Sequence, residues 1–94
     1  MAYDLALTAG KKLSVLGDKQ LAVGEEKYGS GDAYIQKRSL KEIINYSVDR
    51  IKLYLENVEQ GKGNAEALLG DCENHLRFVL AKLEALKEEN KTSG

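Results

Sequence analysis

The stretch Gly24-Glu-Glu-Lys-Tyr-Gly-Ser-Gly-Asp32 (GEEKYGSGD) decides how the rest of the chain is divided. Apolar residues recur with helical spacing on both sides of it, whereas inside it glycine and serine stand among two glutamates, a lysine and a tyrosine. Glycines at the end of a periodic segment are typical of helix ends and turns. We therefore expect one helix to end here, and an irregular connection over residues 24–38, with room for a short helical turn, to lead to the next helix.

The first predicted helix covers residues 4–28. Its apolar residues follow helical spacing, and the carboxylate of Asp4 can cap its first turn. Gly10, Gly17 and Gly24 follow one another at seven-residue intervals, which places them nearly in one line along a helix. Two interpretations of this line stay open. Either it lets another backbone or a ligand approach closely, or it only weakens the helix, since each internal glycine costs about 1 kcal/mol relative to alanine.

Two further helices are predicted over residues 39–60 and 65–89. Ser39-Leu-Lys-Glu42 is a capping box, in which the serine hydroxyl accepts from the amide of Glu42 and the glutamate side chain accepts from the serine amide. Both segments then carry a continuous apolar stripe at helical spacing. Because only the short Gly61-Lys-Gly-Asn64 turn joins them, we expect the two helices to form an antiparallel hairpin.

Composition sets the class of protein. The 94 residues contain no proline and 31% charged residues, which favours helix, and the length fits a single all-α domain over residues 1–94 with a flexible tail at residues 90–94. The formal net charge of −1 makes nucleic acid an unlikely partner, because phosphate contacts require a basic surface. No signal peptide and no membrane span of ~20 apolar residues are recognised, so we expect a cytoplasmic location.

The chain has one cysteine and one histidine. Cys72 lies on the apolar stripe and is interpreted as a buried free thiol. His75 borders the same stripe, four residues after Asp71, and is interpreted as a boundary histidine satisfied by a neighbour; a hydrogen bond or metal shared with Asp71 is the alternative. The pattern contains neither a zinc site nor a catalytic triad.

The helix predicted over residues 39–60 carries an apolar pair that one domain does not explain. Tyr46 and Leu53 lie a heptad apart, off the main stripe and among acidic residues. An apolar pair on a charged face often marks a partner surface, and we therefore expect a helical homo-oligomer that uses this pair. The alternative is that both are isolated surface residues.

The opening stretch and the residues after it also have the chemistry of a ligand site. Glycines permit close backbone approach, a lysine and exposed amides can meet phosphate, and a tyrosine can stack on a base. No phosphate-binding loop or dinucleotide motif is present. The candidate ligand-binding residues are Glu25, Glu26, Lys27, Tyr28, Tyr34, Lys37 and Arg38.

The segment Leu21-Ala-Val-Gly-Glu-Glu-Lys-Tyr-Gly29, followed by Asp49-Arg50, Leu69-Gly-Asp71 and Asn74-His75, resembles the all-α nucleoside triphosphate pyrophosphohydrolases of the MazG-like group, especially short phage forms. The resemblance implies a dimeric or tetrameric helical enzyme that releases pyrophosphate from nucleoside triphosphates. It also implies Mg²⁺ held by carboxylates on two helices.

Carried over residue by residue, the resemblance implies Glu25, Glu26 and Asp71 as the metal ligands. Two further carboxylates of the family pattern are replaced, one by Gly29 and one by Leu68. These replacements favour binding over turnover.

Three functions follow as hypotheses. The first is a small homo-oligomeric protein that sequesters or senses a nucleotide-like or phosphate-bearing ligand without turnover and without a cofactor, by analogy with phage counter-defence proteins of this size. The second is a magnesium-dependent pyrophosphohydrolase with a divergent site. The third is an inhibitor or regulator that binds a protein partner.

Overall fold

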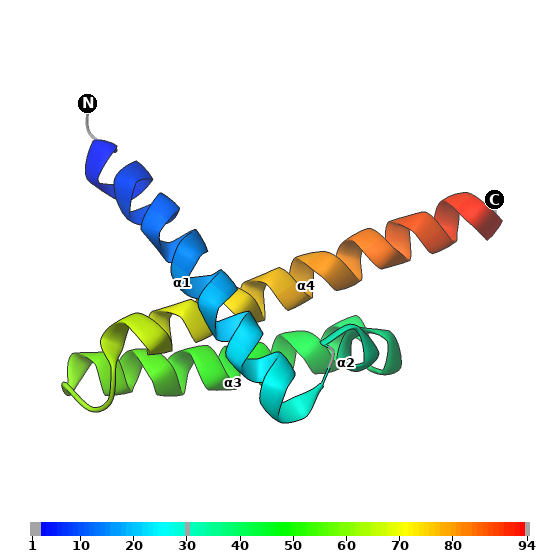
Figure 1. The fold of residues 1–94 in the computed structure, drawn as a ribbon. Helices are drawn as coiled ribbons and strands as arrows, with labels where there is room; N and C mark the ends of the chain where they lie inside the picture. The colour runs from blue at the N-terminus through cyan, green and yellow to red at the C-terminus, as the bar shows by residue number, and fades with distance from the viewer. Residues whose placement is uncertain (1–2, 30, 94) are drawn as a thin grey trace.

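The protein is all-α in the computed structural model, which describes residues 3–29 and 31–93 and places no strand among them. This confirms the predicted fold class. None of the described helices is both long and apolar enough to cross a membrane. The helices, in chain order, are α1 (Asp4–Tyr28), α2 (Gly31–Lys37), α3 (Leu40–Glu59) and α4 (Ala65–Ser93) (Figure 1).

The connection expected to be irregular over residues 24–38 is mostly helical. α1 continues to the residue before Gly29, whose φ of 82° ends the helix, and the short helix α2 follows almost at once. Ser30, in the middle of the connection, lies outside the described residues. α2 is fixed by packing, because the ring centroid of Tyr34 lies 5.7 Å from that of Phe78 on α4.

Both ends of the described chain also differ from the prediction. α1 begins at Asp4 with Tyr3 in the N-cap position, so Asp4 is not the cap. At the other end α4 runs to Ser93, through most of the tail expected at residues 90–94; Gly94 lies outside the described residues. Lysine and glutamate are good helix formers, so a charged composition alone does not end a helix.

The predicted capping box of α3 is confirmed, and Asn64 caps α4. The Ser39 hydroxyl accepts from the Glu42 amide and the Glu42 carboxylate accepts from the Ser39 amide, both at 3.1 Å. Asn64 Oδ1 accepts from the Ala67 amide at 3.2 Å at the start of α4. Gly61 is one of two glycines with positive φ in the turn between the helices. From this turn α3 and α4 run back side by side (Figure 1).

α4 packs against each of the other three helices, and α1 crosses it where two glycines meet. A Cβ at Gly70 would lie 2.6 Å from the carbonyl oxygen of Leu16, and a Cβ at Gly17 would overlap the Glu73 carboxylate. Of the aligned glycines in α1, Gly17 therefore does allow close approach, and α1 is continuous through it. Gly10 and Gly24 have nothing within 4 Å of such a Cβ.

Polar contacts hold this crossing. Asn74 Nδ2 donates to the carbonyl oxygen of Gly17 at 2.8 Å. Arg77 pairs with Asp18 at 2.8 Å and donates to the backbone carbonyl of Ser14 at 3.0 Å. Each of these bonds joins α4 to α1, so the crossing point is fixed by hydrogen bonds as well as by close backbone packing.

Candidate ligand-binding groove

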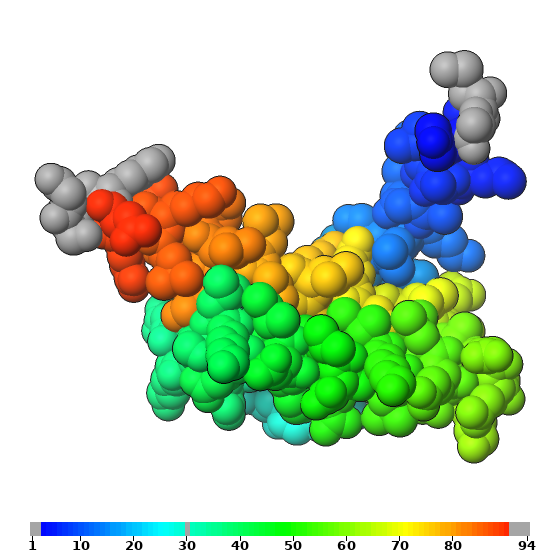
Figure 2. All heavy atoms as spheres, turned by 180° about the vertical axis from the view of Figure 1, so that it is seen from behind, coloured from blue at the N-terminus to red at the C-terminus, as the bar shows by residue number. Residues whose placement is uncertain are grey.

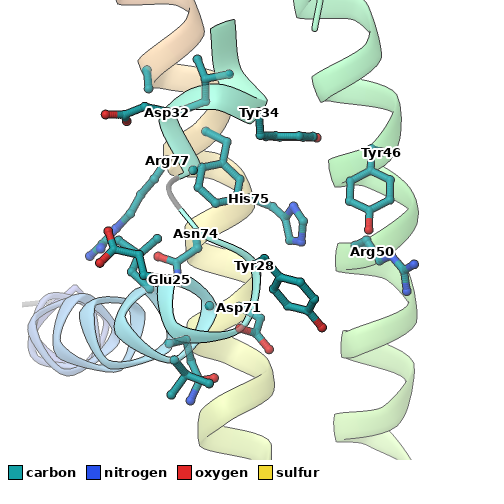
Figure 3. A pocket seen from close by; sticks show the side chains of 18 of the residues that line it. Glu25, Tyr28, Asp32, Tyr34, Tyr46, Arg50, Asp71, Asn74, His75 and Arg77 are labelled. Carbon is teal, nitrogen blue, oxygen red and sulfur yellow. The ribbon is translucent and has the colours of Figure 1, made fainter. Parts of the chain in front are cut away.

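A groove of about 950 Å³ lies between the four helices (Figure 3). α4 forms its floor, α3 one wall, and the C-terminal part of α1 together with α2 the other. The groove exists because α1 crosses α4 rather than running along it (Figure 1), which leaves the end of α1 apart from α3 (Figure 3). The crossing glycines thus determine where the groove opens.

Aromatic side chains from three helices line the groove. The ring centroid of His75 lies 5.7 Å from that of Tyr46, 6.0 Å from that of Tyr54 and 5.8 Å from that of Phe78. Tyr34 completes the cluster, with its centroid 6.3 Å from that of Tyr46. These separations are typical of tilted and edge-on aromatic pairs, which pack rings firmly while leaving faces and edges available.

Three polar atoms that belong to groove-lining residues, but are themselves covered, have no hydrogen-bond partner. They are the hydroxyl of Tyr34, Oδ1 of Asn74 and Nδ1 of His75. Asn74 and His75 are only 5% and 9% exposed, and all three residues line the groove. A buried polar atom without a partner costs about 1 to 3 kcal/mol, so such atoms grouped in one cavity point to a ligand or ordered solvent that satisfies them.

Two arginines lie over the tyrosine rings. The guanidinium carbon of Arg38 is 5.2 Å from the ring centroid of Tyr34, and that of Arg50 is 5.1 Å from the ring centroid of Tyr46. A guanidinium at this distance is attracted to the negative face of the ring. Both arginines therefore stand at the edge of the aromatic wall with N–H donors available to an anionic group.

Charges of both signs line the groove. Burial raises the pKa of the Asp71 carboxyl, and Lys27 partly opposes this by lowering it. Glu42 accepts hydrogen bonds from Ser39, and these lower the pKa of its carboxyl group. Its negative charge is therefore already used in the capping box at the start of α3. The cations are Lys27, Arg38, Arg50 and Arg77, and the anions are Glu25, Asp32, Glu42 and Asp71.

The central histidine is neutral near pH 7. Burial lowers the pKa of His75, and the positive charge of Arg50 lowers it further. Burial also raises the pKa of the Tyr34 hydroxyl, which therefore stays protonated. The wall thus offers a neutral imidazole and a hydroxyl as donors or acceptors for an uncharged ring edge.

The structure brings together most of the predicted ligand-binding residues but not all of them. Glu26 and Lys37 do not line the groove. Tyr28 is 87% exposed and stands beside Asp71 at its mouth (Figure 3). The predicted residues that line the groove are Glu25, Lys27, Tyr28, Tyr34 and Arg38.

The carboxylates implied as metal ligands are only partly brought together. Glu25 and Asp71 both line the groove, whereas Glu26 does not. Within residues 3–29 and 31–93, no three histidine, cysteine, aspartate or glutamate side chains lie close enough to hold a metal ion. Of the three residues implied as Mg²⁺ ligands, the groove thus brings together two.

The two apolar residues of the pair on α3, Tyr46 and Leu53, lie in different surroundings. Tyr46 is part of the groove wall, although its side chain remains 45% exposed. Leu53 is 42% exposed and does not line the groove. Their heptad spacing alone does not reveal this difference.

Sequence reasoning did not assign Arg50, Tyr54, Asn74 or Phe78 to the ligand site. The signal was present only in part: Tyr46, Arg50 and Tyr54 recur every four residues and so share one side of α3. The spacing does not show that this side of α3 faces the end of α1, with α4 as the floor between them. That arrangement is set by the crossing of the helices.

No protein-family model, curated protein or solved structure matches this chain. Its function is therefore argued from the groove.

Proposed function

We propose that this protein binds a small nucleotide-like ligand, with a flat ring and an anionic phosphate group, in the groove and releases it unchanged. The observation that carries the proposal is the cluster of buried unpartnered atoms on Tyr34, Asn74 and His75 inside an aromatic wall. A ring that enters the wall can stack on tyrosine, and small rotations of the covering side chains would bring these atoms to its edge. Binding without turnover suits a protein that sequesters or senses a nucleotide.

The arginines supply the second half of the recognition. Arg38 and Arg50 flank the tyrosine rings, so a ring placed in the wall brings its attached phosphate within reach of a guanidinium. Arginine binds phosphate through paired N–H donors, and such charged hydrogen bonds are about twice as strong as neutral ones. Arg77 is already committed to Asp18 and Glu73 and is assigned to the fold.

The test is isothermal titration calorimetry with AMP, ATP and inorganic pyrophosphate, each with and without Mg²⁺, followed by chromatography of the mixtures. We expect the nucleotides to bind more tightly than pyrophosphate, because only they carry a ring. Arg50→Gln should weaken nucleotide binding about tenfold or more, since it removes charged hydrogen bonds. Lys52→Gln, two residues away on α3 and outside the groove lining, is the matched control.

Three results would contradict the proposal. If no nucleotide binds at millimolar concentration and none is carried by protein purified from its host, as native mass spectrometry would show, the groove is not a nucleotide site. If ATP is converted to AMP and pyrophosphate with Mg²⁺, the pyrophosphohydrolase implied by the resemblance is correct instead. If another protein co-purifies and no nucleotide does, the hypothesis of a protein-binding regulator replaces the nucleotide-binding proposal.

The sequence also predicts a homo-oligomer through Tyr46 and Leu53. The double substitution Tyr46→Glu with Leu53→Glu tests that pair, and an unchanged native mass would exclude it as the oligomer contact. Because Tyr46 also lines the groove, nucleotide binding should be lost in this variant whatever its mass.

A further inference from the structure

The isolated chain exposes more surface than a folded protein of its mass normally does. Its accessible surface is 7197 Å², whereas a compact monomer of 10.4 kDa exposes about 5,400 Å². Its radius of gyration is 15.0 Å, against about 12 Å expected for this length. The excess surface is about 1,800 Å² per chain, from the difference between these two areas.

The core of the single chain is correspondingly small. Among the residues that the structure describes, the only hydrophobic side chains that are buried are Ile43 and Cys72. Fully burying one large aliphatic side chain contributes about 1.5 to 3 kcal/mol, and Ile43 is the one such side chain that is fully buried among the described residues, a small gain against the ordering of four helices. The fold therefore gains stability from a partner that covers its remaining apolar surface.

Exposed large apolar side chains occur on α1, α3 and α4, and most of those of α3 and α4 form one stripe along the paired helices. Ile44, Val48 and Leu55 share one side of α3, with Ile51 between them on the same side. The six large side chains of this α3/α4 stripe, each between 37% and 62% exposed, are Ile44, Val48, Leu55, Leu76, Leu80 and Leu83.

This stripe lies on the side of the molecule away from the groove. At 100° per residue, the α3 members point away from Tyr46 and Arg50, and the α4 members point away from Asp71 and Asn74, which line the groove. Figure 2 shows the corresponding face, where α3 and α4 lie in front and the end of α1 lies behind them. The stripe and the groove are thus separate surfaces.

We propose that a second copy of this chain packs on the α3/α4 stripe, so that the two α3–α4 pairs share one apolar core. The proposal is independent of what the groove binds. A two-fold contact places the same stripe on both sides, so each apolar side chain meets another apolar surface.

The excess surface of the chain is large enough for the interface of a homodimer. A partner that covered the whole excess of about 1,800 Å² on each chain would bury about 3,600 Å² in total, and covering a little over half of it reaches the roughly 2,000 Å² at which obligate homodimers begin. A chain with so small a core of its own is stabilised by such a partner. A copy of itself is present wherever the protein is made, and its occupancy of the stripe rises with protein concentration.

The test is sedimentation equilibrium and native mass spectrometry of the full chain. We expect the wild type at twice the chain mass of 10.4 kDa or a higher even multiple. Val48→Glu with Leu80→Glu should abolish association, because it places four charges in the shared core. The matched control is Leu5→Glu with Leu7→Glu, two exposed leucines of α1 outside the stripe, which should keep the wild-type mass.

Two results would overturn the proposal. One is a wild type that is helical by circular dichroism and has the mass of a single chain at micromolar concentration. The other is loss of association in the control variant while the stripe variant keeps it.

If the stripe variant loses its helical signal, the milder Leu80→Ala decides the question. It should weaken dimerisation about ten- to a hundredfold, because the truncated side chain is missing from both copies. Leu5→Ala, at an exposed leucine of α1 outside the stripe, is its control. Equal dissociation constants for the two single variants would place the contact elsewhere and overturn the proposal.

Discussion

Gly70→Ala at the crossing of α1 and α4 tests whether this contact organises the fold. The added Cβ would lie 2.6 Å from the carbonyl oxygen of Leu16 and 2.9 Å from its carbonyl carbon. Ordinary contact begins near 3.4 Å. Main-chain atoms cannot rotate aside, so α1 must move away from α4 by about 0.8 Å, the difference between the two oxygen distances.

The expected cost follows from opposing contributions. Alanine is favoured over glycine inside a helix by about 1 kcal/mol. Against this, overpacking costs about 1 to 3 kcal/mol. The shift also stretches the bond from Asn74 to Gly17 and that from Arg77 to Ser14, each worth about 1 kcal/mol. We therefore expect the free energy of unfolding to fall by about 2 kcal/mol.

The assay is urea unfolding followed by circular dichroism at one fixed protein concentration, with Gly10→Ala as the control. A Cβ at Gly10 has nothing within 4 Å, so that variant should gain up to about 1 kcal/mol of stability from helix propensity alone. The two alanine variants should thus differ by about 3 kcal/mol. Equal stability of Gly70→Ala and Gly10→Ala would refute the close backbone contact.

Three further predictions concern single side chains. Ser39→Ala removes the capping box of α3 and should lower the free energy of unfolding by about 1 kcal/mol in the same assay; no change would mean that the cap is not formed in solution. Asn74→Ala leaves the Gly17 carbonyl without its partner and should cost about 1 to 3 kcal/mol, whereas a neutral result would contradict the hydrogen bond. His75 has a lowered pKa, so the unfolded chain binds the proton more readily than the folded one. Its contribution is therefore complete above the ordinary histidine pKa near 6.5 and is lost as the pH falls below it. Urea midpoints of the wild type should decrease from pH 7.5 to pH 5 more than those of His75→Gln.

The sequence by itself determined the three long helices and most of their ends, but not the short helix α2. The capping box of Ser39 and the Asn64 cap are local interactions among residues three apart, so they can be read from the chain without knowledge of the fold. Gly29 marks the end of α1 for the same reason, because its positive φ is a local property. The sequence also brought Lys27, Tyr34 and Arg38 to attention, since residues near one another in the chain fall near one another in space.

Only the tertiary structure decided the groove and the exposed stripe. Helical periodicity places Tyr46, Arg50 and Tyr54 on one side of α3 but does not say what they face, and it does not separate Tyr46 from Leu53. That choice depends on the crossing of α1 and α4 at Gly17 and Gly70, a contact between residues far apart in the chain. The partners of His75 depend on the same crossing, because a histidine at the edge of a stripe becomes a buried group with a free nitrogen only when helices close around it.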